Sequence, residues 1–271
     1  MSPLRLVVHG AAGRMGQRII ACAAEPPASG ATAWTLAAAI DRPGHPRQGA
    51  DAGTLAGIAP LGVAVEPVWT CPADVAIDFS LPGAVAGIAA ACVQAGVPLV
   101  VATTGLDATD TRAIEEAARH IAVLQSPSMS LAVNIAMDLV GRASALLERV
   151  GGRTDVEIME CHHRHKEDSP SGTALKFGQI VQEALGQTRV AHGREGRPGA
   201  RPANEIGYHA VRAGDNPGEH TILFGLEGES LSVNVRATNR DCYARGALAA
   251  AAFLVGKPAG LYSMRDVLGI T

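Results

Sequence analysis

Short apolar runs and longer alanine-rich runs alternate through the first half of the chain. Apolar runs bounded by polar, Gly or Pro residues predict buried β-strands, here Leu4–His9, Trp34–Ile40, Val75–Phe79, Pro98–Ala102 and Ile121–Gln125. The intervening runs predict helices at 13–24, 83–95 and 109–120. Because strands that alternate with helices build a parallel sheet covered by helices, this half is predicted to be a doubly wound α/β domain of Rossmann type.

The pattern changes near residue 131. A long helical run over 131–150 is followed by a strand at 155–163 and a helix at 171–185. Two β-type runs, 221–226 and 230–237, flank a short Gly-containing turn, which predicts an antiparallel hairpin. The second half is therefore expected to be a separate α+β domain carrying a mixed or antiparallel sheet.

These patterns place two domains at residues 1–130 and 131–240. The alanine-rich run 243–255 returns to the helical composition of the first half. We therefore expect the C-terminal segment 241–271 to pack back onto the first domain.

Composition limits the classes of function. The chain has 271 residues, 47% of them hydrophobic and 18% charged, which suits compact globular domains. A formal net charge of -3 argues against bulk binding to nucleic acid or to an anionic membrane. Five scattered cysteines without a CxxC pair are typical of reduced thiols. With neither a secretory leader nor a membrane-spanning run in the sequence, we expect a cytoplasmic protein.

A glycine-rich turn, Gly10–Gly16, follows the first predicted strand and opens the first predicted helix. In this position a tight turn and a helix N-terminus can hold the pyrophosphate of a dinucleotide. The spacing is G-x-x-G-x-x-G, with Ala12 where the Rossmann fingerprint has its middle glycine. A merely flexible turn is the alternative interpretation of the motif.

Asp41 and Arg42 end the second predicted strand and strengthen the dinucleotide interpretation. An acidic side chain there can accept hydrogen bonds from the ribose hydroxyls of NAD, whereas an arginine can neutralise the 2′-phosphate of NADP. Having both residues predicts that either cofactor is accepted. The alternative is a solvated loop pair.

Further polar residues follow the later strands, where a doubly wound sheet binds its ligand. We expect Asp78–Ser80 and Ala102–Gly105 to line the nicotinamide half of the site. Ser126–Ser130 lies at the predicted domain junction and is a candidate cofactor contact. Ordinary turn chemistry explains Thr103–Gly105 equally well, and a plain linker explains 126–130.

The densest chemistry lies in His162–Lys166, which holds three histidines, an arginine and a lysine. Such a segment suits proton transfer and binding of a small anion. Three histidines also suggest a metal site, but Arg164 and Lys166 would oppose a divalent cation, so we predict no metal. Ser169–Thr173 then places hydroxyls and small residues at a helix start, whose N–H groups favour a carboxylate. A capped helix after a solvated loop is the alternative, and it leaves the histidines unexplained.

Taken in order, these segments resemble the 4-hydroxy-tetrahydrodipicolinate reductase family, also called dihydrodipicolinate reductases, of the diaminopimelate route to lysine. The segments that carry the resemblance are Val8–Gly16, Thr103–Gly105, Glu160–Lys166 with Asp168–Ala174, Gly218–Thr221, Gly228–Glu229 and Arg240–Gly246. The resemblance implies reduction of a small cyclic dicarboxylate by NADPH or NADH, with loss of the 4-hydroxyl group as water. It also implies a homotetramer built through the sheet of the second domain.

The resemblance assigns roles to individual residues. It implies that His162 is the acid/base residue and Lys166 the proton donor, while His163, Gly172 and Thr173 bind the substrate carboxylates. It also makes residues 1–130 the dinucleotide-binding domain and 131–240 the substrate-binding and oligomerisation domain. The implied dinucleotide contacts are Gly10, Ala11, Ala12, Gly13, Arg14, Met15, Asp41, Arg42, Ala102, Thr103, Thr104, Ser126, Pro127, Ser128 and Met129.

The chain departs from the usual family pattern at three places. Ser126–Ser130 reads Ser-Pro-Ser-Met-Ser where Ala-Pro-Asn-Phe-Ser is common, Leu106 replaces a phenylalanine, and Val235 replaces a frequent histidine. Two other functions stay open from the sequence. One is a non-catalytic regulator that binds a dinucleotide, and the other is a reductase of another small carboxylated imine.

Overall fold

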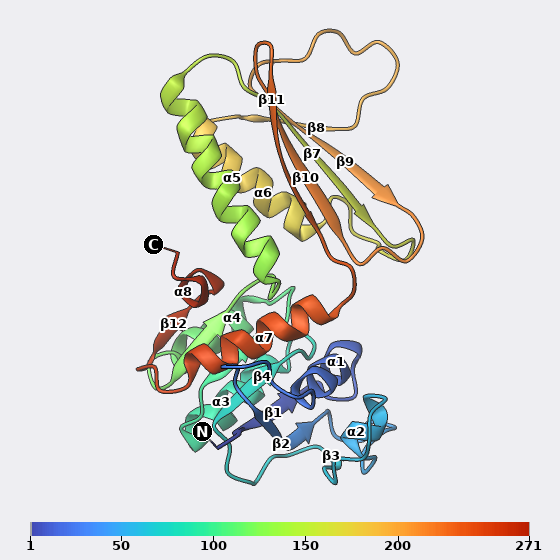
Figure 1. The fold of residues 1–271 in the computed structure, drawn as a ribbon, viewed down its shortest axis with the longest axis vertical. Helices are drawn as coiled ribbons and strands as arrows, with labels where there is room; N and C mark the ends of the chain where they lie inside the picture. Colours follow the sequence, from blue (N-terminus) through green and yellow to red (C-terminus); the bar gives the residue numbers. More distant parts are fainter. Residues whose placement is uncertain (1, 271) are drawn as a thin grey trace. The chain divides into compact units, whose positions relative to one another are not determined.

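The computed structural model describes residues 2–270 and divides the chain into two compact units. The first unit runs to Leu131 and resumes at Arg240, and the second comprises Ala132–Asn239. Figure 1 shows the elements of both units. No helix among the described residues has the length and apolar character that a membrane crossing requires.

The first unit contains a seven-stranded sheet in which every neighbouring pair is parallel. Its order is β12-β6-β5-β4-β1-β2-β3. The strands are β1 (Leu4–His9), β2 (Trp34–Ile40), β3 (Val65–Glu66), β4 (Val75–Asp78), β5 (Leu99–Val101), β6 (Ala122–Gln125) and β12 (Gly260–Tyr262). The predicted doubly wound, Rossmann-type α/β architecture is confirmed.

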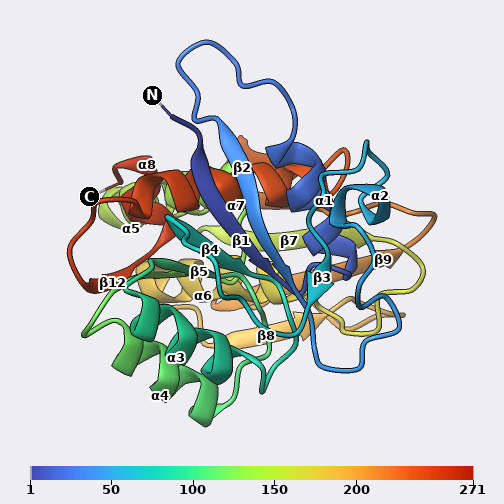
Figure 2. The same cartoon turned by 90° about the horizontal axis from the view of Figure 1, so that it is seen from below.

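Helices cover both faces of this sheet, as Figure 2 shows. α1 (Arg14–Ala23) and α7 (Asp241–Leu254) bury one side against β-strand residues such as Leu6 and Val100. α3 (Val85–Ala95) and α4 (Ala108–Ala117) cover the other side. The short helices α2 (Ala52–Leu55) and α8 (Met264–Leu268) complete the unit. Since successive residues of a strand point to opposite faces, strands buried on both sides are apolar at almost every position, as the sequence shows.

The second unit holds a five-stranded mixed sheet of order β11-β10-β7-β9-β8. Its strands are β7 (Asp155–His162), β8 (Arg189–His192), β9 (Glu205–Arg212), β10 (Glu219–Gly225) and β11 (Ser230–Arg236). β10 pairs antiparallel with β7 and β11, whereas β9 runs parallel to β7 and β8. The helices are α5 (Leu131–Val150) and α6 (Gly172–Leu185). The predicted mixed sheet and the hairpin are confirmed.

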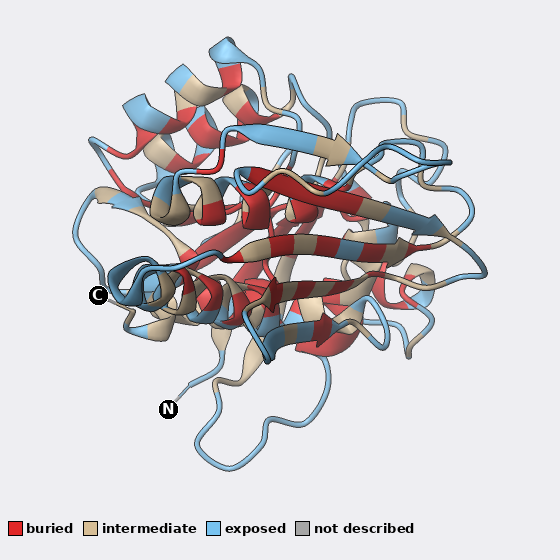
Figure 3. Ribbon diagram, turned by 90° about the horizontal axis from the view of Figure 1, so that it is seen from above, coloured by how far each residue is buried: buried red, intermediate tan, exposed pale blue. Residues whose placement is uncertain are grey.

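One face of this sheet is buried and the other is open. Along β7 the even-numbered residues from Val156 to His162 are buried, whereas the odd-numbered residues are half-buried or exposed. The alternation is visible as bands along the strands in Figure 3. Apolar residues of α5 and α6, including Phe177, share a core with the buried strand residues. We call the side that carries Asp155, Glu157, Met159 and Cys161 the open face.

Six elements were not predicted from the sequence: α2, β3, β8, β9, β12 and α8. The largest is β9, whose apolar residues are interrupted by Gly207 and His209 and which begins and ends with charged residues. Its charged and polar side chains have partners only in the folded sheet, so the local pattern gives a weak strand signal. The consequence for the site is substantial, because β9 carries Arg212.

Candidate functional site

The predicted dinucleotide contacts all follow the ends of parallel strands in the first unit. Gly10–Met15 follow β1, Asp41 and Arg42 follow β2, Ala102–Thr104 follow β5, and Ser126–Met129 follow β6. The structure therefore brings the four groups to the carboxyl edge of one sheet, where open α/β sheets bind their ligands.

Two glycines allow the turn after β1 to close tightly. Gly10 has a φ of 78°, and a Cβ at this residue would lie 2.5 Å from the carbonyl oxygen of Phe79. A Cβ on Gly16 would lie 2.2 Å from the carbonyl oxygen of Gly10. The motif is therefore more than a flexible turn, because packing requires its first and last glycines.

The backbone N–H groups of the turn divide into two sets. Those of Gly10–Ala12 are used within the protein: the first two donate to the Ile40 carbonyl at 2.9 and 3.0 Å, and the third donates to Asp41 at 3.0 Å. Gly13 is the N-cap of α1 and supplies no side-chain acceptor. The N–H groups of Arg14–Gly16 then have no carbonyl of the helix to donate to. An anion at this turn fits the N-terminus of α1, and the residues present suit a pyrophosphate.

Asp41 anchors the same turn. One carboxylate oxygen accepts the Ala12 N–H, and the other accepts the N–H of Arg42 at 2.9 Å. Each oxygen keeps a further lone pair for a ribose hydroxyl. The Arg42 side chain is exposed, so it is available to a phosphate.

Asp78 has a structural position that the sequence did not indicate. It is fully buried at the end of β4, where it accepts a hydrogen bond from the Thr103 hydroxyl at 2.6 Å. Its other oxygen lies 2.7 Å from Nδ1 of His9. The carboxylate thus ties the ends of β1, β4 and β5 together and fixes the position of Thr103, the middle residue of a predicted cofactor contact.

The segment after β6 is almost entirely buried within the first unit. Ser126, Ser128 and Met129 are buried and Pro127 is exposed. The Ser126 hydroxyl donates to the carbonyl of Ser128 at 2.8 Å. This short hydrogen bond holds the turn in the sequence Ser-Pro-Ser-Met, which differs from the usual family pattern.

The second predicted cluster lies in the second unit, at the end of β7. The strand ends at His162, one residue earlier than predicted, so strand alternation does not extend through His162–Lys166. His162 is buried, whereas Arg164 and His165 are exposed. A turn follows the strand, in which the Lys166 N–H donates to the carbonyl of His163 at 3.1 Å. Only one of the three histidines therefore belongs to the buried face.

His162 shares that face with Glu160. Nδ1 of His162 lies 2.5 Å from a carboxylate oxygen of Glu160, whose side chain is 1% exposed. Arg212, which lies beside His162 in the register of β9, donates to both Glu160 oxygens at 2.8 and 2.7 Å. The backbone N–H of Ser171 donates to Glu160 at 3.1 Å. One buried carboxylate is therefore bound by three different parts of the second unit.

Ser171 is the N-cap of α6, and it contacts a further histidine of the cluster. Its hydroxyl accepts the N–H of Ala174 at 3.1 Å, as expected for an N-cap. The same hydroxyl lies 3.0 Å from Nε2 of His220 on β10. The His220 ring meets that of His162 edge to face, with ring centroids 5.2 Å apart. Gly172 and Thr173, the predicted carboxylate contacts, form the first turn of this helix.

Lys166 and His163 lie in the turn beside this cluster. The Lys166 ammonium donates to Asp168 at 2.8 Å, and its side chain is 21% exposed. The rings of His163 and His165 have centroids 6.2 Å apart. The structure thus brings His162, Gly172 and Thr173 to one region of the second unit, with Lys166 and His163 on the adjoining turn.

Burial and charge shift the pKa values of this cluster. Burial lowers the pKa of His162, and the neighbouring Glu160 works against that shift. Burial, followed by the charge of His162, lowers the pKa of His220 to about 4. Although burial opposes ionisation of Glu160, hydrogen bonds from Arg212 and His162 lower its pKa overall. At neutral pH Glu160 is therefore an anion and His220 is neutral.

Sequence reasoning assigned no role to Glu160, Arg212 or His220. Glu160 and His220 stand in segments that carry the family resemblance, and Glu160 is two residues before His162, so strand alternation would have placed it on the same face. Arg212 gave no local signal, because it lies in the unpredicted strand β9. Among the described residues, no three His, Cys, Asp or Glu side chains form a cluster suited to a metal ion.

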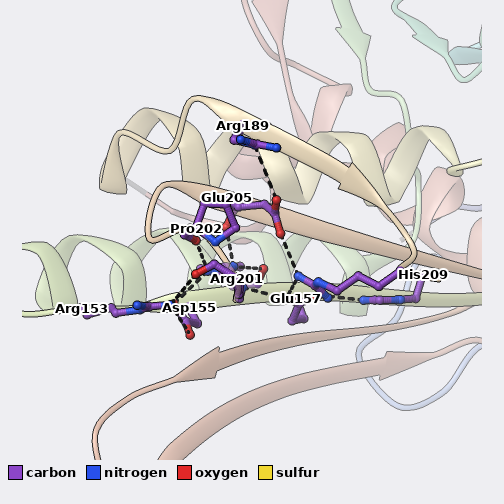
Figure 4. A network of polar contacts seen from close by, with 10 residues as sticks. Arg153, Asp155, Glu157, Arg189, Arg201, Pro202, Glu205 and His209 are labelled. Atoms are coloured by element: carbon purple, nitrogen blue, oxygen red, sulfur yellow. Dashed lines mark hydrogen bonds and ion pairs between the residues drawn. The ribbon is translucent and has the colours of Figure 1, made fainter. Parts of the chain in front are cut away.

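A separate ionic network occupies the open face of the sheet (Figure 4). Glu157 accepts hydrogen bonds from Arg194 at 2.7 Å and from Arg201 at 2.9 Å, and it lies 2.7 Å from Nε2 of His209. Burial opposes its ionisation, but these hydrogen bonds lower the pKa of Glu157 to about 2. The network attaches the polar loop 193–203 to β7 and β9.

Both units match models of a single protein family. Residues 4–129 match the N-terminal part of dihydrodipicolinate reductase, and residues 132–268 match its C-terminal part. The chain belongs to the dihydrodipicolinate reductase family. The resemblance inferred from the sequence is confirmed, and dihydrodipicolinate reductases are oxidoreductases that bind a nicotinamide dinucleotide.

Curated relatives extend the match across the chain. This dihydrodipicolinate reductase family member is 52% identical over 277 residues to the 4-hydroxy-tetrahydrodipicolinate reductase of Rhodopirellula baltica, covering 99% of this chain and 97% of the relative. It is 45% identical over 272 residues to that of Anaeromyxobacter dehalogenans, covering 98% of each. A dipicolinate-bound dihydrodipicolinate reductase from Paenisporosarcina sp. TG-14 has the same fold, with a TM-score of 0.71 at 22% identity over 98% of this chain and 99% of that one.

Proposed function

We propose that this protein is a 4-hydroxy-tetrahydrodipicolinate reductase, which uses NADPH or NADH to form tetrahydrodipicolinate in diaminopimelate and lysine biosynthesis. The observation that carries the proposal is the buried His162 beside the first turn of α6, in a chain that matches this family over both units. The overall change replaces a ring hydroxyl by hydrogen. It requires one hydride, supplied by the reduced nicotinamide, and one proton, and it releases the hydroxyl as water.

His162 and Lys166 are proposed to supply and move that proton. Imidazole and ammonium groups are the usual proton carriers near neutral pH. His162 is held by Glu160, and Lys166 by Asp168, so each cation has a carboxylate partner in the protein. Glu160 favours the protonated form of His162, and Asp168 orients the Lys166 side chain.

The first turn of α6 is proposed to bind the substrate carboxylates. The N–H groups at a helix N-terminus and the helix dipole favour a negative charge. Ser171 caps only the N–H of Ala174 with its hydroxyl, so those of Gly172 and Thr173 are suited to a carboxylate. His163 is the third proposed carboxylate contact.

The dinucleotide is proposed to bind at the carboxyl edge of the sheet in the first unit. Its pyrophosphate would lie at the N-terminus of α1, its ribose at Asp41 and its nicotinamide near Thr103 and Ser126–Met129. Asp41 suits NADH and the exposed Arg42 suits NADPH, so we propose that both are used.

The two cofactors can be separated by one substitution each. Arg42→Ala is expected to raise KM for NADPH about tenfold, the loss of one charge-assisted hydrogen bond, while KM for NADH stays the same. Asp41→Asn keeps an acceptor for the Ala12 N–H, and it is expected to raise KM for NADH instead. Steady-state kinetics with each cofactor measure both values. Equal changes for the two cofactors would contradict these assignments.

We propose that the protein forms a homotetramer in the cytoplasm, through the open face of the second sheet. The support is the exposure of the apolar side chains of Met159 and Val211 on that face. Five free cysteines suit a reducing compartment. Light scattering after gel filtration measures the mass, and Met159→Asp is expected to reduce it by placing a charge in the contact.

The catalytic proposal is tested by coupled turnover. Aspartate semialdehyde, pyruvate and the upstream synthase generate the unstable substrate in place, and the oxidation of NADPH or NADH is followed by absorbance. His162→Ala and Lys166→Ala are expected to lose at least about 100-fold in kcat, the usual contribution of a proton-transfer group. His165→Ala, an exposed histidine of the same segment, and Lys176→Ala are the matched controls.

Three outcomes separate the candidate functions. Synthase-dependent oxidation that is lost in His162→Ala and Lys166→Ala, but not in the controls, supports the reductase and both roles. Cofactor that binds without being consumed favours the non-catalytic regulator. Consumption that needs a different carboxylated imine favours a reductase of that compound.

A further inference from the structure

The Glu160 carboxylate has all of its acceptor sites filled. Oε2 faces Nδ1 of His162 and one nitrogen of Arg212, while Oε1 accepts from the other nitrogen of Arg212 and from the Ser171 N–H. A carboxylate has about four acceptor positions, so none is left for water or for substrate. Glu160 therefore does not take part in the reaction directly, and its role has to be exerted through the groups it holds.

The most direct consequence concerns the tautomer of His162. Glu160 is ionised and can only accept, so the hydrogen bond at 2.5 Å requires the proton of the imidazole to be on Nδ1. Nε2 is then the nitrogen that can accept or deliver a proton. A histidine whose ring is fixed at one nitrogen and reactive at the other is the arrangement that acid/base catalysis needs.

We propose that Glu160, held in place by Arg212, is a positioning residue that keeps His162 in the Nδ1–H tautomer and aligns its ring with the carboxylate-binding turn of α6. This inference rests on the proposed reductase function, in which His162 is the acid/base group. Neither Glu160 nor Arg212 is proposed to contact the substrate.

Arg212 supports this role from two directions. Besides both oxygens of Glu160, its guanidinium donates to the carbonyl of Asp168 at 2.8 Å. Asp168 is the partner of Lys166. The pair Glu160–Arg212 therefore connects the end of β7, the start of α6 and the turn that carries the second proposed proton donor.

The charged groups around His162 act on its protonation in opposite directions. Glu160 favours the imidazolium, whereas Lys166 and Arg212 disfavour it. His220, whose ring lies against His162, stays neutral near pH 7. Removing the negative charge of Glu160 alone leaves burial and two cations, all of which favour the neutral imidazole. The direction of the resulting change is therefore unambiguous.

The test compares Glu160→Gln with a matched control on the same strand. Glu157→Gln also removes a carboxylate that binds two arginines, but from the open face of β7 and away from His162. Histidine labelled with ¹⁵N is introduced into the full-length enzyme, and solid-state NMR reports the protonation of Nδ1 and Nε2. The His162 signals are assigned by their loss in His162→Gln.

The expected NMR result is specific to the proposal. In the wild type and in Glu157→Gln, neutral His162 shows a protonated Nδ1 and an unprotonated Nε2. In Glu160→Gln the two tautomers mix, and the imidazolium of His162 titrates about 1 to 3 pH units lower, because an opposite charge in contact has been removed. A residue that serves stability alone would leave the tautomer and the titration of His162 unchanged.

Kinetics provide the second readout. Glu160→Gln is expected to lower kcat about 10- to 100-fold, as is usual when the group orienting a histidine is removed, while KM for the dinucleotide stays within about twofold. The limb of the kcat–pH profile that reports loss of the proton from His162 should move to lower pH by the same amount as the NMR titration.

Glu160→Gln leaves Arg212 as a poorly paired cation, and the variant risks misfolding. The double variant Glu160→Gln/Arg212→Met removes both charges together and avoids this penalty. Either folded variant, as judged by circular dichroism, serves the test, and both are expected to lose the single tautomer.

The possible results test the positioning role of Glu160 and the reductase function separately. A single Nδ1–H tautomer in a folded variant without the Glu160 carboxylate would overturn the positioning role, whatever the enzyme reduces. If the wild type shows the tautomer and loses it in the variant, but does not oxidise cofactor with the synthase-made substrate, the reductase proposal fails and the Glu160–His162 coupling stands.

Discussion

Gly16 and Gly87 form a matched pair that measures how tightly the turn proposed to bind the dinucleotide is packed. Each is the third residue of its helix, Gly16 in α1 and Gly87 in α3. A Cβ on Gly16 would lie 2.2 Å from the Gly10 carbonyl oxygen and 2.7 Å from Cα of Ala11, whereas a Cβ on Gly87 would have no heavy atom within 4 Å. The same substitution, glycine to alanine, therefore separates packing at the turn from helix propensity.

The magnitudes follow from these distances. Gly87→Ala should stabilise the protein by about 1 kcal/mol, the difference in helix propensity between glycine and alanine. In Gly16→Ala the same gain is opposed by displacement of the Gly10 carbonyl by about 1 Å to reach ordinary contact. Overpacking of this kind costs about 1–3 kcal/mol. The melting temperature of Gly16→Ala should therefore lie several degrees below that of Gly87→Ala, at about 2–4 °C per kcal/mol.

The binding consequence is more specific than the loss of stability. Because displacing Gly10 also moves the backbone beside the α1 N-terminus, Gly16→Ala should weaken NADPH binding at least about tenfold, or about 1.4 kcal/mol. Gly87→Ala should leave it unchanged. Differential scanning calorimetry gives the melting temperatures, and the fluorescence of bound NADPH gives Kd. If the two variants bind and melt alike, the turn after β1 does not hold the dinucleotide.

Two further predictions concern the second unit. The buried, neutral His220 has a pKa of about 4, whereas the ordinary pKa of histidine is 6.5. As the pH falls, the unfolded state therefore takes up a proton before the folded state does, and the free energy of unfolding decreases between about pH 6.5 and 4. Urea unfolding measures the free energy of unfolding, which should fall between pH 7.5 and pH 5 by about 2 kcal/mol more in the wild type than in His220→Phe. Equal decreases in the two proteins would contradict this assignment. In Gly178→Ala the new Cβ would lie 1.6 Å from the Tyr208 hydroxyl oxygen, so we expect the free energy of unfolding to fall by about 1–3 kcal/mol. Adding Tyr208→Phe should recover part of it, and no recovery would mean that the hydroxyl is not the obstacle.

The sequence predicts the first unit well because its strands are buried on both faces. An apolar run such as Val75–Asp78 has no solvent-exposed face, so its strand signal does not depend on the partner. The carboxyl-edge position of Asp41 and Thr103 follows directly from that topology. The use of Asp78 as a buried tie to His9 and Thr103 does not follow, because it depends on the register of three strands.

The cluster around His162 was predicted in its chemistry but not in its geometry. His162 was identified, and the serine-rich helix start was expected, because both signals are local. Strand alternation did not predict that β7 ends at His162, since the end is set by the turn whose Arg164 N–H donates to the Gly214 carbonyl. Arg212 reaches Glu160 across 52 residues of sequence, through a strand whose own pattern is weak. Contacts of that separation exist only in the assembled sheet.

The sheet of the first unit is completed by a segment that is synthesised after the whole second unit. β12 pairs with β6 at the sheet edge, and α7 supplies the buried residues Ala247, Ala250 and Leu254 to one of the cores. The ribosome makes residues 132–239 first, which takes roughly 5–20 s. During that interval β6 is an unpaired edge, and the side of the sheet that α1 covers still lacks α7. The nascent first unit is thus exposed to chaperones and to aggregation until the strand after α7 leaves the exit tunnel, while the second unit can already fold.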